Sequence, residues 1–244
     1  MPRPTTVVTG GSRGIGAATC LRLAADGHDL ALSYVHDGRA AERTARAVRE
    51  AGARCVTVRA DVSDAGEVDL LFDTVRAELG PVTGLVNNAG VTGPLGRLAD
   101  TPAEVLRRVV DVNLLGCLLC CRRAARDMTA GGAVVNISSG AATLGSPGEY
   151  VHYAAAKAAV DTLTLDLAKE LGPQGVRVNA VAPGLVDTGI HAAMGDPGRP
   201  ARMAPAIPLG RPGEATEIAA AVAWLLSAEA SYTTGAVLRV AGGR

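Results

Sequence analysis

A tyrosine and a lysine four residues apart are the residues of this sequence whose types and spacing most directly suggest chemistry. Tyr153 and Lys157 enclose three alanines at the start of a segment with helical periodicity. In a helix, residues at i and i+4 lie on one face, with Cβ atoms about 5–6 Å apart. A phenol ionises near pH ~10, and a neighbouring ammonium group favours the phenolate. We therefore expect Tyr153 to exchange a proton with a substrate hydroxyl or carbonyl group near neutral pH.

The competing interpretation of this pair is an ordinary exposed tyrosine and lysine on a helix. Lys157 is one of only two lysines in the chain, the other being Lys169, and the intervening alanines leave room for a closely packed ligand. Tyr150 is a second tyrosine nearby, but no lysine follows it at helical spacing. These features favour a reactive role for Tyr153.

The stretch TGGSRGIG at residues 9–16 permits two chemistries. Gly10, Ser12 and Gly14 match G-x-S-x-G, the nucleophile elbow of serine hydrolases. Gly10, Gly14 and Gly16 match instead a glycine-rich turn that holds a dinucleotide pyrophosphate at a helix N-terminus, with Ser12 as a hydrogen-bonding residue. The elbow needs a histidine, an acid and an oxyanion loop, and none of the four histidines lies in a matching motif. The phosphate-binding turn is therefore favoured.

The elements that must position these residues alternate between strand and helix patterns along the whole chain. Apolar strand patterns cover residues 5–10, 29–34, 55–62, 84–90, 133–139, 176–184 and 236–243. Helical patterns cover residues 15–26, 40–51, 65–79, 101–128, 153–171 and 215–227. This alternation predicts an α/β fold: a single doubly wound Rossmann-type domain over residues 1–244, with a parallel sheet of about seven strands and helices on both faces. Ligands bind such sheets beyond the carboxyl ends of the strands, and the chemically interesting residues follow strands here.

Composition excludes several other classes of function. The 244-residue chain is 48% apolar and has a formal net charge of zero, which gives no reason to expect nucleic acid or an anionic membrane as a partner. We expect no signal peptide and no membrane span, because no apolar run approaches ~18 residues. Five cysteines without regular framing argue against a disulfide scaffold, and we expect no metal site. Cys117 and Cys120 form a C-x-x-C in an apolar helical stretch, so buried thiols are expected. A cytoplasmic location follows.

Several motifs occur together in an order and spacing typical of one family. They are TGGSRGIG at 9–16, NNAG at 87–90, Asn113, Ser139, YAAAK at 153–157 and PG at 183–184. On these residues the chain resembles the short-chain dehydrogenase/reductase family, and in particular its 3-oxoacyl-carrier-protein-reductase-like and glucose-dehydrogenase-like members. The resemblance covers essentially the whole chain, including TGAVLRVAGG at 234–243.

The resemblance implies roles for four catalytic residues. Tyr153 is the general acid/base, Lys157 lowers its pKa together with the nicotinamide cation and holds the nicotinamide ribose, and Ser139 hydrogen-bonds the substrate oxygen. Strand alternation sends Ser138 the opposite way, as a strand-end turn residue. Asparagine is unfavourable inside a helix, so we expect a kink at Asn113. The resemblance implies that Asn113 also binds a water molecule that links Lys157 to solvent in a proton relay. The alternative for Asn113 is a local helix irregularity without a role.

The spacing between the serine and the tyrosine departs from that of many family members. Ser139 precedes Tyr153 by fourteen residues, one more than in those members. We therefore expect a one-residue insertion near Glu149 and Tyr150.

The end of the second strand bears on which nicotinamide is used. NAD-preferring folds have an acidic residue at this position, which binds the hydroxyl groups of the adenosine ribose. In this sequence the position is occupied by Tyr34, and the next acidic residue, Asp37, lies about one turn too far along the chain. Arg13 in the glycine turn could form an ion pair with the 2′-phosphate of NADP(H). The alternative is that Arg13 is a solvent-exposed loop residue without a role in binding. We predict NADP(H), with NAD(H) as the alternative. The expected cofactor-binding residues are Gly10, Ser12, Arg13, Gly14, Ile15, Gly16, Tyr34, Asp61, Val62, Asn87, Ala89, Gly90, Tyr153, Lys157, Pro183, Gly184 and Thr188.

The segment 187–212 is the expected substrate lid, because it combines apolar side chains with glycine, proline and alanine and shows weak periodicity. Such a segment suits a hydrophobic or adaptable small molecule. We predict reversible hydride transfer between NADPH and a ketone or secondary alcohol, with ketone reduction as the physiological direction. The resemblance also implies a homotetramer. Two alternatives on the same fold are a catalytically silent dinucleotide-sensing regulator and a dehydratase or epimerase; the presence of Ser139, Tyr153 and Lys157 favours the oxidoreductase.

Overall fold

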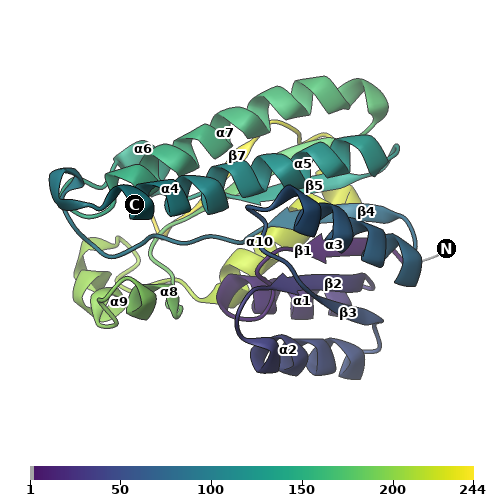
Figure 1. Ribbon diagram of the computed structural model, residues 1–244, viewed down its shortest axis with the longest axis horizontal. Helices are drawn as coiled ribbons and strands as arrows, with labels where there is room; N and C mark the ends of the chain where they lie inside the picture. The colour runs from purple at the N-terminus through teal and green to yellow at the C-terminus, as the bar shows by residue number, and fades with distance from the viewer. Residues whose placement is uncertain (1–2) are drawn as a thin grey trace.

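The apolar runs form strands that are covered on both faces, as their composition predicts. The computed structural model describes residues 3–244 and contains one parallel sheet of seven strands in the order β3-β2-β1-β4-β5-β6-β7 (Figure 1). The strands are β1 (Thr5–Val8), β2 (Asp29–Tyr34), β3 (Cys55–Arg59), β4 (Val82–Asn87), β5 (Ala133–Ile137), β6 (Arg177–Pro183) and β7 (Val237–Val240). The predicted α/β fold is confirmed.

Helices cover both faces of the sheet. One layer consists of α1 (Gly14–Ala25), α2 (Gly38–Glu50) and α10 (Ala215–Leu226), which bury Leu23, Val48 and Leu225 against the strands. The other layer consists of α3 (Ala65–Glu78), α5 (Gly116–Asp127) and α7 (Val151–Leu171), around Phe72 and Leu171 (Figure 1). None of the helices within the described residues is both long and apolar enough to cross a bilayer.

The helical region expected over residues 101–128 is interrupted at Asn113, where a kink was expected. The structure has α4 (Ala103–Val110), a π-helical turn at Asp111–Leu115, and then α5. Pro102 is in an extended conformation and precedes the first helical residue. The weakly periodic segment 187–212 contains two short helices, α8 (Ile190–Ala193) and α9 (Arg199–Met203), where glycines and prolines keep helices short.

A buried polar network links the middle of the sheet to the helices above it. Asn87 Nδ2 on β4 donates to Asn136 Oδ1 on β5 at 2.8 Å, and Asn136 Nδ2 donates to Thr164 Oγ1 on α7 at 2.9 Å. Asn87 Nδ2 also contacts Cys121 Sγ at 3.2 Å. Cys117, Cys120 and Cys121 are buried, free thiols, which confirms the expectation for this stretch.

The sheet order reverses between β1 and β4. In an open parallel sheet this switch point opens a crevice at the carboxyl ends of the strands. The turn after β1 and the loops after β4, β5 and β6 therefore meet at one edge, and they carry nearly all of the expected site residues.

Candidate active site

The turn between β1 and α1 has a shape that glycine alone provides. Gly10 and Gly14 have φ values of +63° and +55°, in the left-handed region. A Cβ on Gly16 would lie 2.3 Å from the carbonyl oxygen of Gly10, so α1 approaches the turn this closely only with glycine at that position. Because α1 begins at Gly14, its free backbone N–H groups face the crevice and suit a phosphate. Ser12, Arg13 and Ile15 lie on the same turn, and the Arg13 side chain is exposed.

Thr9 and Asn88, which the sequence analysis did not assign to the site, fasten this turn to the end of β4. Thr9 Oγ1 accepts hydrogen bonds from the backbone N–H groups of Asn88 and Ala89, each at 3.0 Å. Asn88 Nδ2 donates to the carbonyl oxygens of Thr9 at 2.9 Å and Gly10 at 3.0 Å. In the sequence, both are short polar residues within a glycine-containing motif, Thr9 directly before Gly10 and Asn88 two residues before Gly90.

The hydrogen bonds of three histidines argue against a nucleophilic Ser12. His28 Nδ1 bonds Thr6 Oγ1 at 2.8 Å, His152 Nε2 bonds the Thr92 carbonyl at 3.0 Å, and His191 Nε2 bonds the Val186 carbonyl at 2.8 Å. Within residues 3–244, no histidine forms a hydrogen bond to Ser12. Among the described residues, no histidine is therefore placed to activate Ser12 as a nucleophile.

Tyr34 and Asp61 occupy the side of the crevice where adenosine was expected. Tyr34 ends β2 and is half-buried, with its ring against the start of α2 at Gly38. Asp61 accepts hydrogen bonds from Ser63 at 2.7 Å and pairs with Arg108 at 2.8 Å. Burial raises the pKa of Asp61, but the hydrogen bonds from Ser63 and Arg108 outweigh it and hold that pKa below its ordinary value. The neighbouring Val62 is buried.

Ser139 and Tyr153 come together at the end of β5. Ser139 Oγ accepts a hydrogen bond from the N–H of Ala141 at 3.1 Å and is also hydrogen-bonded to Tyr153. Ser138 is buried and donates to the carbonyl of Lys157 at 3.4 Å, so the two serines point in different directions as alternation predicts.

The electrostatics of Tyr153 differ from the sequence expectation. Burial raises the pKa of Tyr153 to about 12, and the hydrogen bond with Ser139 offsets only part of this increase. Lys157 was expected to lower that pKa. Its Nζ lies 5.6 Å from the centre of the Tyr153 ring and donates to the carbonyl of Ile137 at 2.7 Å. Since the ammonium group is directed at a strand carbonyl, desolvation of the phenol dominates.

Lys157 is itself strongly affected by its surroundings. The side chain is 4% exposed, and burial lowers its pKa from 10.5 to about 8. It therefore remains largely protonated at pH 7 but lies close to the point at which it loses its charge.

Asn113 lies in the π-helical turn, where a kink was expected. Its Nδ2 donates to the carbonyl oxygens of Val91 at 2.7 Å and Val109 at 2.8 Å. Its buried Oδ1 has no partner among the described residues. A Cβ on Gly90 would lie 2.8 Å from this oxygen and 3.7 Å from Lys157 Nζ, so the NNAG turn passes between the two groups.

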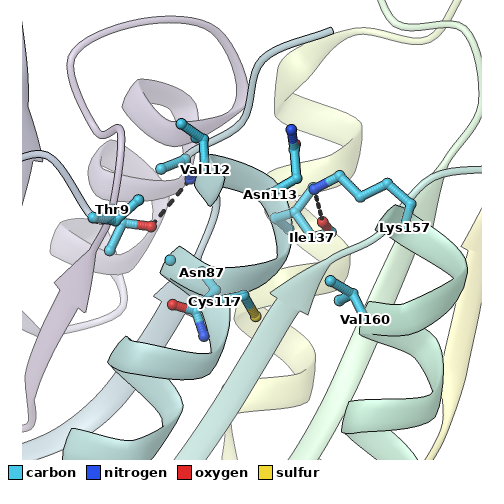
Figure 2. Close-up of a pocket in the computed structure, with 11 residues that line it drawn as sticks. Thr9, Asn87, Val112, Asn113, Cys117, Ile137, Lys157 and Val160 are labelled. Atoms are coloured by element: carbon cyan, nitrogen blue, oxygen red, sulfur yellow. Dashed lines mark hydrogen bonds between the residues drawn. The ribbon is translucent and has the colours of Figure 1, made fainter. Parts of the chain in front are cut away.

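A small cavity separates Asn113 from Lys157. Figure 2 shows it lined also by Thr9, Asn87 and Cys117, with the Lys157–Ile137 hydrogen bond at its rim. Its volume is about 10 Å³. One water needs roughly 10–15 Å³ and two or more polar partners, and the cavity offers both.

The loop after β6, which carries Gly184 and Thr188, borders the crevice opposite the loop after β4. The carbonyl of Pro183 accepts a hydrogen bond from Gly140 N at 2.8 Å, which ties this loop to the one carrying Ser139. A Cβ on Gly184 would lie 2.7 Å from Ala241 Cα. Thr188 Cγ2 lies 3.5 Å from the position of a Cβ on Gly14, so Thr188 faces the glycine turn.

These residues fit a dinucleotide. The glycine turn presents the free backbone N–H groups at the N-terminus of α1, and the unpaired Asn113 Oδ1 and the Lys157 ammonium group supply an acceptor and a donor beside Gly90. The described residues contain no group of three or more His, Cys, Asp or Glu side chains arranged to hold a metal ion.

Comparison with known proteins gives the class that this fold and site define. Residues 10–244 match the family model described as Enoyl-(Acyl carrier protein) reductase. The chain is 45% identical to an uncharacterized oxidoreductase, YgfF, of Escherichia coli, over 98% of both chains. It is 43% identical to 3beta-hydroxysteroid dehydrogenase 1 of Eggerthella lenta, over 98% of this chain and 92% of that one. It is 37% identical to 3-oxoacyl-[acyl-carrier-protein] reductase of Staphylococcus aureus, over 98% and 97%.

Solved structures agree with these relatives. A short chain dehydrogenase from Burkholderia cenocepacia in complex with NADP matches with a TM-score of 0.93 and 34% identity, over 98% of this chain and 97% of that one. A blue fluorescent protein from a metagenomic library in complex with NADPH matches with a TM-score of 0.92 and 35% identity, over 99% and 98%. The protein is therefore an oxidoreductase. It belongs to the short-chain dehydrogenase/reductase family, in the branch that contains the 3-oxoacyl-carrier-protein reductases.

Proposed function

We propose that this oxidoreductase uses NADP(H) and transfers hydride reversibly between the nicotinamide and a ketone or secondary alcohol, with Tyr153 as general acid/base. The observation that carries the proposal is the hydrogen-bonded pair of Ser139 and Tyr153 above a buried Lys157, at the same sheet edge as the glycine turn. Relatives named for alcohol dehydrogenation, and neighbours solved with NADP and NADPH, support it.

Bound NADPH supplies the hydride in this scheme. Ser139 Oγ hydrogen-bonds the carbonyl oxygen of the substrate, and Tyr153 donates a proton to that oxygen as it becomes a hydroxyl group. A pKa of about 12 keeps the phenol protonated at neutral pH, which is the form that reduction requires. In the oxidation direction the phenolate accepts the hydroxyl proton.

Lys157 and Asn113 support the proton transfer. With the cofactor bound, the Lys157 ammonium group would hold the ribose hydroxyls and stabilise the phenolate that Tyr153 becomes. The cavity of about 10 Å³ beside both residues holds one water, which returns a proton towards Tyr153 through Lys157. Asn113 Oδ1, fixed by the two hydrogen bonds of its Nδ2, faces the same region.

Cofactor preference follows from the residues at the adenosine end. Tyr34 stands where an NAD-preferring protein carries an acid, and the exposed Arg13 is free to pair with a 2′-phosphate. NADP(H) is therefore the preferred cofactor, with NAD(H) as a second choice. The segment 187–212 acts as the substrate lid, and the assembly is a homotetramer in the cytoplasm. Exposed Leu115 and Leu118 on the α5 side and Trp224 and Val237 on the α10/β7 side supply apolar area for two such interfaces.

The deciding experiment follows NADPH and NADH oxidation against β-ketoacyl thioesters, diketones, quinones, steroid ketones and cyclic ketones, with Tyr153→Phe beside the wild type. Turnover with NADPH that falls by about 10²-fold or more in Tyr153→Phe supports the proposal. Tight NADPH binding without turnover of any compound would favour the dinucleotide-sensing regulator instead. Equal turnover by wild type and variant would remove Tyr153 from the mechanism.

A further inference from the structure

Arg199, on α9, is a buried arginine that forms an ion pair with the half-buried Glu149, in the loop before α7. Its side chain is 4% exposed, and it donates two hydrogen bonds to the carboxylate of Glu149, at 2.7 and 2.6 Å. A bidentate guanidinium–carboxylate pair is strong and directional, and without Glu149 the charge of the buried Arg199 would have no compensating partner. The hydrogen bonds from Arg199 hold the pKa of Glu149 below its ordinary value, so the pair stays ionised at neutral pH. The pair therefore fastens α9 to the loop that precedes α7.

Backbone hydrogen bonds add a third segment to this contact. The carbonyl of Glu149 accepts a hydrogen bond from Gly96 N at 2.8 Å, and the carbonyl of Met194 accepts one from Leu95 N at 3.3 Å. The loop after β4 is thus tied both to the loop before α7 and to α8. We name the meeting of segments 94–96, 146–150 and 190–203 the Glu149 junction. Figure 1 shows α8 and α9 at the end of the molecule where α6 (Ala141–Leu144) and the start of α7 also lie.

Tyr150 connects the junction to the proposed general acid/base. One guanidinium nitrogen of Arg199 contacts Tyr150 Oη at 3.3 Å, and the guanidinium carbon lies 5.5 Å from the centre of the Tyr150 ring. On its other side, the Tyr150 ring meets the Tyr153 ring edge-on, with centroids 5.4 Å apart and an interplanar angle of 88°. A T-shaped aromatic pair and a cation over a ring are both favourable contacts, so Tyr150 is fixed from two sides.

We propose that Arg199 is a positioning residue that fixes Tyr150 and segment 190–203 as the outer wall of the substrate site. The inference rests on the proposed function, because it assigns this wall to the ketone that Tyr153 protonates. Arg199 contacts neither cofactor nor substrate, and it acts through Glu149 and Tyr150. The wall presents an aromatic ring together with the apolar Leu95 and Met194, so it suits a ketone with an apolar ring or chain.

The variant that tests this role is Arg199→Met, with Arg202→Met as the matched control. Arg202 lies on the same short helix, but it is 58% exposed and pairs with Asp196 at the surface. We expect Arg199→Met to raise KM for the best apolar ketone about tenfold, with kcat within about threefold and NADPH affinity unchanged. Arg202→Met should match the wild type. An unchanged KM in Arg199→Met, or a loss confined to kcat or to NADPH binding, would overturn the proposal.

Amide hydrogen exchange tests the junction without any substrate. The amides of Leu95 and Gly96 and those of 190–203 should exchange about tenfold faster or more in Arg199→Met, but not in Arg202→Met. Glu149→Gln keeps the side-chain shape while removing the charge, and it provides a milder second variant with the same expected direction. If the wild type turns over no ketone, the proposed function fails while exchange still reports on the junction. Equal exchange in wild type, Arg199→Met and Glu149→Gln would overturn the junction itself.

Discussion

Lys157 donates its 2.7 Å hydrogen bond to the carbonyl of Ile137, the last residue of β5, rather than to the phenol of Tyr153. The ammonium group is thereby held beneath the loop that carries Ser139, with only 4% of the side chain exposed. The sheet thus fixes the position of a charge that the protein interior disfavours. This arrangement indicates that Lys157 lowers the stability of the fold, a cost that its proposed role in proton transfer would explain.

Replacing Lys157 with methionine should stabilise the fold while removing activity. The folded-state pKa of about 8 lies below the ordinary 10.5, so between these values the unfolded state binds more protons and wild-type stability rises with pH. At pH 7 we expect Lys157→Met to be more stable by about 1–3 kcal/mol, after allowing for the lost hydrogen bond to Ile137. Denaturant unfolding from pH 7 to 10.5 measures this, and the difference should shrink across that range.

The only other lysine provides the control for this measurement. Lys169 is on the same helix and its side chain is 68% exposed. Lys169→Met should leave both stability and its pH dependence within about 0.5 kcal/mol of the wild type. A Lys157→Met variant less stable than wild type at pH 7 would contradict the argument.

The two neighbours of the Tyr153 phenol should shift its titration in opposite directions. The hydrogen bond with Ser139 lowers the pKa of Tyr153, whereas Tyr150 raises it. In alcohol oxidation at saturating NADP+, the positive charge of the bound nicotinamide lowers the pKa of Tyr153 from its value of about 12, and the rate rises with pH as the phenolate forms. Ser139→Ala should therefore move the midpoint of that rise upward. Tyr150→Phe should move it downward or leave it in place. The pH dependence of kcat/KM measures both; an upward shift in Tyr150→Phe, or none in Ser139→Ala, would contradict this prediction.

Gly90 should tolerate no side chain, because its Cβ would enter the space between Asn113 and Lys157. Asn113 Oδ1 would lie 2.8 Å from that Cβ, and two hydrogen bonds from Nδ2 prevent the amide from moving aside. We expect Gly90→Ala to reduce kcat/KM by about tenfold or more. Gly172→Ala is the control, since Gly172 has ordinary helical φ and its Cβ would meet nothing within 4 Å. Steady-state kinetics with NADPH measure kcat/KM for both variants. Equal kcat/KM values for Gly90→Ala and Gly172→Ala would count against the proposed position of the cofactor beside Gly90.

Arg13 should determine the choice between the two nicotinamide cofactors. If its exposed guanidinium group binds the 2′-phosphate, Arg13→Ala will lower the NADPH-over-NADH preference by about tenfold or more, chiefly by weakening NADPH. Arg22→Ala on the same helix removes an arginine that pairs with Asp26 far from the turn, and it should leave the preference unchanged. The ratio of kcat/KM values for the two cofactors measures this. An unchanged ratio in Arg13→Ala would show that other residues bind the phosphate.

The sequence was sufficient to predict most of the fold because the pattern is local. Apolar runs and helical periodicity indicated all seven strands, and the glycine turn fell at the switch point of the sheet. Alternation along β5 also separated Ser138 from Ser139 correctly. Even the irregularity at Asn113 was visible, because asparagine is unfavourable inside a helix.

The features that sequence analysis missed depend on contacts between distant residues. Arg199 and Glu149 are fifty positions apart, and neither lies in a periodic pattern that points to the other. Thr9 and Asn88 join two motifs whose closeness only the sheet order reveals. In the chain alone, the pKa of Tyr153 is raised and not lowered, because burial of the phenol dominates and Lys157 is not among its causes. The lowering that was expected from Lys157 together with a bound nicotinamide cation stays a prediction.

The π-helical turn at Asp111–Leu115 makes the number of residues between α4 and α5 as important as their identity. Each residue of a regular helix turns the chain by about 100°, and the wider turn resets the direction in which α5 faces. Deleting one residue here would let the wide turn close to a regular one, so that α4 and α5 merge into a single helix while Cys117, Cys120 and Cys121 keep facing the sheet. It would displace Asn113 in the same step. Homologous chains that differ in length are therefore expected to place their insertions and deletions elsewhere, and to keep this stretch at a constant length.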